Sequence, residues 1–182
     1  MTTSQTHILL VSGPAGVGKS TLGYEIGTQL RQAGVAHVIL DSDELDRVWP
    51  LNGAEQEALN RANLAAFWIN ASALGHCRLV LVGVFLDPDA NRTWIDAAIP
   101  GAKVTRIVLD APDEELERRV RTREIGSGAE DQLTRTLVQA HNFRRRNAGS
   151  PDLMATNGVA VAELARQVIE RSRWLLAAPE QA

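Results

Sequence analysis

The chain reads Gly13-Pro14-Ala15-Gly16-Val17-Gly18-Lys19-Ser20 close to its amino end. This run matches the phosphate-binding loop pattern G-x-x-x-x-G-K-[ST] at every fixed position. Glycines let such a loop turn its backbone N–H groups inward around a polyphosphate. The first turn of the following helix adds the positive end of its dipole. We therefore expect this loop to bind a nucleoside triphosphate.

Two side chains of the loop have expected roles of their own. Lys19 can reach the β- and γ-phosphates as a point charge, and the Ser20 hydroxyl can ligate Mg²⁺. The residues expected to contact the nucleotide here are Gly13, Ala15, Gly16, Val17, Gly18, Lys19, Ser20 and Thr21.

The flanking segments have the character that this loop requires. Residues 7–12 form a short apolar run, which is typical of a buried parallel strand. After the loop, Leu22, Ile26 and Leu30 recur at helical spacing. The context is therefore strand, loop and helix, in that order.

The rest of the chain alternates strand and helix patterns. Strands are expected at 35–41, 79–86, 104–110 and, more weakly, 151–156, and helices at about 55–74, from 88, from 112, at about 131–146 and after 158. Such alternation predicts a three-layer α/β fold in which helices cover both faces of a five-stranded parallel sheet. The loop and the other strand ends should then share one edge of the sheet, and the active site should lie there.

Composition narrows the class of protein. The 182 residues suit one domain, 1–182, with a frayed tail at 178–182. A net charge of −3 gives no general attraction to nucleic acid or to an anionic membrane. Neither a signal peptide nor a stretch of about 20 apolar residues that could span a bilayer is present. We expect a cytoplasmic protein.

Acidic residues follow the second expected strand, in Asp41-Ser42-Asp43. Phosphoryl transfer to a hydroxyl needs a carboxylate that orients the hydroxyl or accepts its proton. Asp41 ranks ahead of Asp43 for this role because it ends the strand. The alternative is that Ser42 or Asp43 only caps a helix that begins at Glu44.

The third expected strand ends without an acid, and the next one along the chain is Asp87. Asp87 precedes Pro88 and is expected to cap a helix. The role of metal ligand therefore passes to Ser20, the phosphates, water and the carboxylates after the second strand, with Asp41 as the candidate.

Arginines gather between residues 117 and 123, ahead of Gly126-Ser127-Gly128. We expect a lid at about 122–146 that closes over the nucleotide. Arg119 and Arg123 are the candidates for phosphate contact, and Arg118 and Arg121 for contact with the adenine. The alternative is a solvated helix whose arginines pair with nearby glutamates. A second cluster, 144–146, either ends a solvated helix or contacts an acidic substrate.

The acceptor side is expected in the segment from about residue 48 to residue 68. Trp49 offers a flat apolar face and one N–H donor, which suits a sugar or a polycyclic ligand. The alternative for Trp49 is core packing. Asp43 and Arg47 are the other candidates for contact with the acceptor.

Taken together, these features resemble the small P-loop kinases. They are the loop, Asp41-Ser42-x-x-Leu45-Asp46, the arginines after the fourth strand, and Asn157-Gly158 before the last helix. Chloramphenicol phosphotransferases, adenylyl-sulfate kinases and gluconate kinases are the members most similar in element order. The resemblance implies the sheet order 2-3-1-4-5 and ATP with Mg²⁺ as phosphoryl donor.

The resemblance also implies roles for single residues. Asp41 matches the carboxylate that orients or deprotonates the acceptor in the phosphotransferases, and Asp43 matches the second acid of the Asp-x-Asp in adenylyl-sulfate kinases. Asn157 and Gly158 would fall near the adenine. Two patterns are missing: the substrate-gripping sequence of adenylyl-sulfate kinases, and the Asn-Lys-x-Asp with which GTPases read guanine.

The sequence thus predicts an ATP-dependent kinase that phosphorylates a hydroxyl of a small molecule, with an antibiotic as one candidate acceptor and a monomer or homodimer as the working form. A nucleoside, nucleotide or adenylyl-sulfate kinase is the alternative enzyme. A nucleotide-binding switch protein is the alternative of another class.

Overall fold

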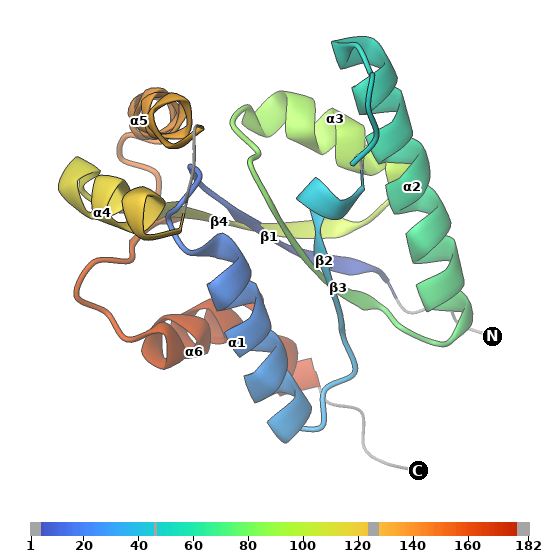
Figure 1. The fold of residues 1–182 in the computed structure, drawn as a ribbon. Helices are drawn as coiled ribbons and strands as arrows, with labels where there is room; N and C mark the ends of the chain where they lie inside the picture. Colours follow the sequence, from blue (N-terminus) through green and yellow to red (C-terminus); the bar gives the residue numbers. More distant parts are fainter. Residues whose placement is uncertain (1–4, 46, 124–127, 178–182) are drawn as a thin grey trace.

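The computed structural model describes residues 5–45, 47–123 and 128–177, without the side chains of residues 88, 89, 123, 176 and 177. Within these residues, parallel strands form one sheet in the order β2-β3-β1-β4-β5, as expected (Figure 1). The strands are β1 (His7–Ser12), β2 (Val38–Asp41), β3 (Arg78–Gly83), β4 (Lys103–Asp110) and β5 (Leu153–Ala155). The expected tail at 178–182 lies outside the described residues.

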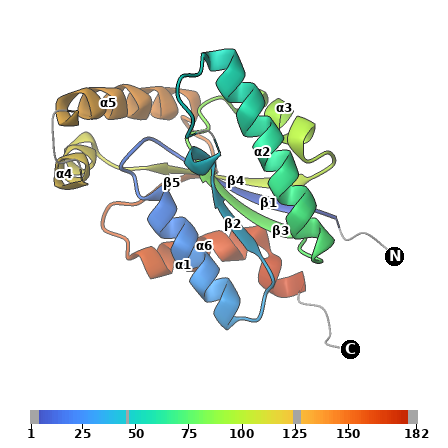
Figure 2. The same cartoon turned by 45° about the vertical axis from the view of Figure 1, so that its right-hand side comes forward.

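Helices cover both faces of this sheet. The α-helices are α1 (Lys19–Gln32), α2 (Gly53–Ala73), α3 (Pro88–Ala98), α4 (Asp113–Arg123), α5 (Ala129–Arg146) and α6 (Val161–Ser172), and the 3₁₀ helices are η1 (Ser42–Glu44) and η2 (Trp174–Ala177). In two views, α1 and α6 lie on one face, α2 and α3 on the other, and α4 and α5 beyond the carboxyl end of β1 (Figures 1 and 2).

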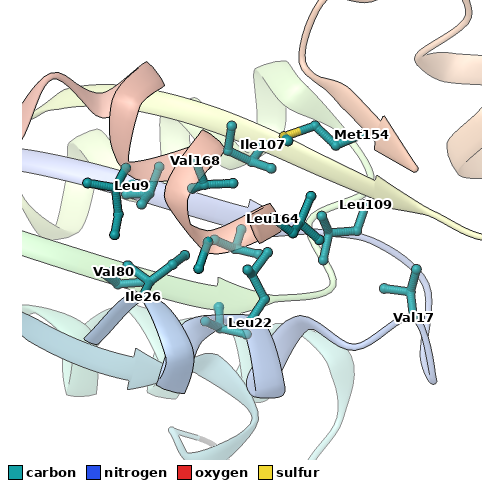
Figure 3. Close-up of a cluster of buried hydrophobic side chains, with 14 of the residues drawn as sticks. Leu9, Val17, Leu22, Ile26, Val80, Ile107, Leu109, Met154, Leu164 and Val168 are labelled. Atoms are coloured by element: carbon teal, nitrogen blue, oxygen red, sulfur yellow. The ribbon is translucent and has the colours of Figure 1, made fainter. Parts of the chain in front are cut away.

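The central strand β1 is apolar from Ile8 to Val11 because both of its faces are buried. Leu9 and Val11 face one core, with Leu22 and Ile26 of α1 and the buried side of α6 (Figure 3). Ile8 and Leu10, at the alternate positions, face a second core formed with α2 and α3. A strand that is buried on both faces has no position at which a polar side chain meets water.

Several boundaries differ from the sequence expectation; the second strand, for example, begins at Val38 and the fifth spans Leu153–Ala155. Two of the differences have a clear local cause. The second helix begins at Gly53 because Asn52 and Glu55 form a capping box, in which each side chain accepts from the other residue's backbone N–H. The third strand ends at Gly83, because Phe85 beyond it hydrogen-bonds to the Ser12 side chain. The expected cap at Asp87 is confirmed, since its Oδ1 accepts from Ala90 N at 3.1 Å.

Among the described residues, no helix is both long enough and apolar enough to cross a bilayer. Of the expected lid, residues 124–127 and the side chain of Arg123 lie outside the description.

The packing of α1 on the sheet generates a test of stability. Gly23 is buried, and a Cβ there would lie 2.8 Å from Val82 Cγ2 in β3. Alanine is the better helix former, by about 1 kcal/mol. We nevertheless expect Gly23→Ala to lower the free energy of unfolding by about 1–3 kcal/mol, because Val82 is itself buried and cannot move aside.

The measurement is urea unfolding of purified protein, followed by circular dichroism. Gly53→Ala is the matched control, since nothing lies within 4 Å of a Cβ at that position. Equal stability changes in the two variants would contradict the close approach of α1 to β3.

Candidate active site

The phosphate-binding loop is held in shape by two glycines. Gly13 has a φ of 151°, and a Cβ there would meet the Leu109 carbonyl oxygen at 2.7 Å. Gly18 has a φ of 102° and is the N-cap of α1 in the left-handed conformation. A side chain at Gly13 would clash with the Leu109 carbonyl oxygen. At both positions the positive φ also disfavours any residue other than glycine. The loop thus enters α1 with its amides at the helix N-terminus, where an anion is favoured.

Protein groups contact this loop in the structure. The Gln139 Oε1 atom, on α5, accepts from the Ala15 backbone N–H at 3.1 Å. The Lys19 Nζ atom donates to the Pro14 carbonyl at 3.0 Å, and Arg119 Nη1 donates to the Val17 carbonyl at 2.8 Å. Of these three side chains, Gln139 belongs to the expected lid at 122–146, and Arg119 lies on α4 just before it. The loop is therefore in direct contact with α4 and α5.

A cavity of about 680 Å³ surrounds the loop. Its polar end is formed by residues 15–21, and its other end is apolar, with Val159, Val161 and Leu164. The other lining residues are Leu22, Asp43, Val84, Arg119, Gln132 and Thr156. This arrangement has room for phosphates at one end and a flat apolar base at the other.

Some residues expected at the nucleotide do not line this cavity. Gly13 shapes the loop from outside it, and Asn157 and Gly158 form the turn between two lining residues, Thr156 and Val159.

The arginines of α4 differ sharply in their positions. Arg119 lines the cavity with a side chain that is 27% exposed, and it also contacts Thr156. Arg118 is 65% exposed and makes two hydrogen bonds to Glu115. Arg121 pairs with Glu117 and with Glu130 of α5. Of the described arginines, Arg119 is thus placed at the nucleotide cavity, whereas Arg118 and Arg121 form the solvated pairs of the alternative interpretation.

Hydrogen bonds from Arg118, which has the larger effect, and from Arg119 lower the pKa of Glu115 from its usual value to about 2. Glu115 therefore stays ionised at neutral pH and fixes Arg119 through its Nε, at 2.7 Å, while Nη1 of the same guanidinium reaches the loop.

The end of β2 meets the first turn of α1 through a short hydrogen bond. Ser20 Oγ donates to Asp41 Oδ2 at 2.7 Å, and Asp41 Oδ1 accepts from the Asp43 backbone N–H at 3.2 Å. Asp41 is thus the N-cap of η1, whereas the alternative interpretation of the sequence had Ser42 or Asp43 cap a helix that begins at Glu44. Both of its oxygens have partners at this turn.

A second cavity, of about 400 Å³, lies beside the first, and Asp43 and Val84 line both. The first two turns of α2 form one wall and α3 forms another, with the end of β3 between them. The residues that line this cavity are Ser42, Asp43, Gly53, Gln56, Glu57, Asn60, Val84, Phe85, Ala90, Asn91 and Trp94. We call it the acceptor cavity.

Two residues predicted to contact an acceptor lie elsewhere. Trp49 is 91% exposed and lines neither cavity, because the loop 47–52 runs on the outside and α2 forms the wall in its place. Arg47 is paired with Glu44 and donates to the Asp43 carbonyl, also outside the cavity lining. In the structure, neither of these two residues belongs to the lining of the acceptor cavity.

The wall residues that sequence reasoning missed are Gln56, Glu57, Asn60 and Asn91. Each is an ordinary polar residue on an amphipathic helix, so no local signal separates it from a solvated one. For Trp94 the sequence does give a signal, because Asp87 marks the start of α3 and Trp94 lies two helical turns after it. Its ring lies 5.8 Å from that of Phe85.

The second arginine cluster fastens α5. Arg144 donates to Asp110 at the end of β4, to Asp113 of α4 and to the Ala111 carbonyl. Arg146 pairs with Asp87 at 2.7 Å. Neither side chain lines a cavity described above. The cluster therefore positions α5 and is not part of either wall.

Comparison with known proteins agrees with this architecture. The model of the family AAA_33, described as an AAA domain, matches residues 8–148. A search of curated protein sequences finds no match.

Solved structures share the fold. The tunicamycin resistance protein of Deinococcus radiodurans has a TM-score of 0.58 at 18% identity, over 92% of this chain and 95% of its own. A gluconokinase from Sinorhizobium meliloti 1021 has 0.58 at 18%, over 93% of each chain. The Mycobacterium tuberculosis APS kinase in complex with AMPPNP and APS has 0.55 at 17%, over 96% and 99%. At these identities the likeness concerns the fold alone.

The contrast between the α4 arginines generates a prediction. We expect Arg119→Leu to weaken binding of AMPPNP about tenfold or more, because a hydrogen bond from a charged group contributes about 1.5–3 kcal/mol. Arg118→Leu is the matched control, since it removes the same charge from the same helix and the same partner, Glu115. We expect Arg118→Leu to change the dissociation constant for AMPPNP by no more than about twofold. Calorimetric titration measures both, and equal losses would refute the placement of Arg119.

Proposed function

The chain belongs to the AAA_33 family, the AAA domain family, and from this premise we propose that it is an ATP-dependent kinase that phosphorylates a hydroxyl of a small molecule. The observation that carries the proposal is the meeting of two cavities at one carboxylate. Asp43 lines both the cavity of the phosphate-binding loop and the acceptor cavity. A kinase needs its donor and acceptor sites to meet where the phosphoryl group passes.

In the proposed reaction, the loop amides and Lys19 hold the triphosphate, and the acceptor hydroxyl attacks the γ-phosphorus in line. The bond between that oxygen and phosphorus forms while the bond from phosphorus to the β,γ-bridging oxygen breaks. Asp43 accepts the hydroxyl proton, and ADP and the phosphate monoester leave. Arg119, together with Arg123, stabilises the charge on the phosphates.

Asp43 is favoured as the base over Asp41, which reverses the order drawn from the sequence. The reason is geometric, since Asp43 lines both cavities, at the place where the transferring phosphoryl group and the acceptor would meet. A base must lie within hydrogen-bond reach of the hydroxyl. Asp43 lines the acceptor cavity, and Asp41 does not.

Ser20 and Asp41 suit a magnesium ion. A hydroxyl and a carboxylate 2.7 Å apart are hard oxygen ligands beside the phosphates. No cluster of three or more His, Cys, Asp or Glu that could hold a metal occurs among the described residues. This fits an ion held by one carboxylate, a hydroxyl, water and the phosphates of the nucleotide. When bound, Mg²⁺ supplies neutralisation of phosphate charge.

A direct test is the release of ADP from Mg·ATP with and without hydroxylated small molecules, antibiotics among them. Antibiotics are included because one protein of this fold is a tunicamycin resistance protein. A kinase is stimulated many-fold by its acceptor and yields a phosphate monoester, which mass spectrometry identifies. Slow release that no acceptor changes would instead support a switch protein.

The two aspartates give the sharpest prediction. We expect Asp43→Asn to lower kcat on the order of 10²-fold or more, with the affinity for ATP nearly kept, since a general base contributes on that order. Asp41→Asn should instead raise the Mg²⁺ concentration needed for half-maximal activity. The measurement is kcat at increasing Mg²⁺ for both variants. A normal kcat for Asp43→Asn would remove it as the base.

A further inference from the structure

The acceptor cavity has a distinctive set of polar groups. Its described wall contains the carboxamides of Gln56 and Asn60, from α2, and of Asn91, from α3. It also contains two carboxylates, Asp43 and Glu57, and no lysine, arginine or histidine. The cavity therefore offers hydrogen bonds and negative charge, and its described lining has no cation to meet an anionic group.

From this wall we infer that the acceptor is a polyhydroxylated molecule without an anionic group, either uncharged or carrying an ammonium. The inference rests on the proposed kinase function and names the substrate class of that same site.

Cations near the cavity are committed to other carboxylates. Arg47 pairs with Glu44, Arg92 with Asp96, and Arg146 with Asp87, each at 2.7 Å. Arg61 lies one turn beyond Glu57 on α2 and is not in the cavity lining. A carboxylate or phosphate on the acceptor would thus lose its hydration and face Asp43 and Glu57 without a counter-charge in the described wall, which is costly.

Carboxamides suit hydroxyl groups in particular. A hydroxyl both donates and accepts, and each Asn or Gln side chain has donors and an acceptor. Asn91 shows an unmet need of this kind, because its Nδ2 atom is buried and has no hydrogen-bond partner among the residues that the structure describes. A buried donor of this kind is stabilised by an oxygen from a ligand.

The remaining wall is apolar and aromatic. Phe85 and Trp94 lie with ring centroids 5.8 Å apart and planes inclined by 39°, and Val84 adjoins them. Such a surface packs against the C–H face of a sugar or cyclic polyol, while the hydroxyls at the rim meet the carboxamides. At about 400 Å³, the cavity is in the range of small-molecule sites.

The test is acceptor-dependent ADP release at saturating Mg·ATP, over hydroxylated compounds in matched sets. Each set has an uncharged, an ammonium and a carboxylate member, such as glucose, glucosamine and gluconate. We expect the uncharged or ammonium member of the responding set to exceed the carboxylate member at least tenfold in kcat/KM.

The failures of the two proposals differ. Equal or better use of carboxylate members overturns the inference and leaves the kinase proposal standing. If no member of any set stimulates release, the kinase proposal fails and the inference fails with it.

Charge reversal tests the same point on the protein side. We measure the ratio of kcat/KM for the uncharged or ammonium member to kcat/KM for the carboxylate member. Glu57→Lys should lower this ratio about tenfold. Glu114→Lys is the matched control, because Glu114 is an exposed residue of a helical first turn that lines neither cavity. An unchanged preference in Glu57→Lys, or an equal change in both variants, overturns the inference. So does a loss of activity in Arg61→Gln that is confined to carboxylate acceptors, because Arg61 would then be the missing cation.

Asn91 tests the hydrogen-bonding part. Asn91→Ala should raise the KM for the responding acceptor about tenfold, with a smaller change in the KM for ATP. Asn70→Ala, an exposed position of α2 outside the cavity, is the control and should leave both constants within twofold. Thermal unfolding of each variant separates loss of fold from loss of binding. If KM for the acceptor is unchanged in folded Asn91→Ala, the carboxamides do not hold the hydroxyls.

Discussion

The hydrogen bond from Ser20 Oγ to Asp41 Oδ2 joins the donor side of the site to the acceptor side. Ser20 belongs to the first turn of α1, directly after the phosphate-binding loop, and Asp41 ends β2, an outer strand of the sheet. Because Asp41 also caps η1 through the Asp43 N–H, its two oxygens fix where the 3₁₀ turn starts. The position of Asp43 between the two cavities depends on this one side chain.

The loop is also held from the opposite side, by α4 and α5. Arg119 reaches the Val17 carbonyl, and Gln139 accepts from the Ala15 N–H. Arg144 fastens α5 to the end of β4 through Asp110, so these contacts are anchored to the sheet and not to the helices alone. A phosphate oxygen that binds the Ala15 N–H would replace the Gln139 carboxamide. At the Ala15 N–H, α5 and a bound phosphate would therefore compete for the same donor.

How much of the fold and of the site the sequence predicts depends on how close together in the chain the informative residues lie. The loop lies within eight consecutive residues, 13–20, and its glycines are required by the backbone itself, so the sequence identifies it directly. The strand order followed from the resemblance and was confirmed. The choice between Asp41 and Asp43 was harder, because it depends on a three-residue 3₁₀ turn that no periodicity marks.

The acceptor wall was the least predictable part, for a physical reason. Gln56 and Asn91 are 35 residues apart on separate helices, and they line one cavity only because α2 and α3 pack on the same face of the sheet. Trp49 is a larger side chain with a stronger sequence signal, yet it lies outside. The rotation of α2 and α3 about their axes determines which of their side chains line the cavity. This rotation is set by buried contacts such as those of Leu64, Trp68 and Ile95.

The donor side and the acceptor side of the site differ in how freely their residues can change. The donor side depends on backbone amides and on glycine angles, which tolerate little change while the fold is kept. The acceptor side depends on side chains at helix positions outside the two hydrophobic cores, which change more freely without loss of the fold. The solved structures at 16–18% identity accordingly share the fold with this chain, while their names include a gluconokinase, an APS kinase and a shikimate kinase. In this chain the proposed determinants of the acceptor are the cavity-lining residues in the first turns of α2 and α3, where carboxamides and carboxylates occur in the described wall and cations do not.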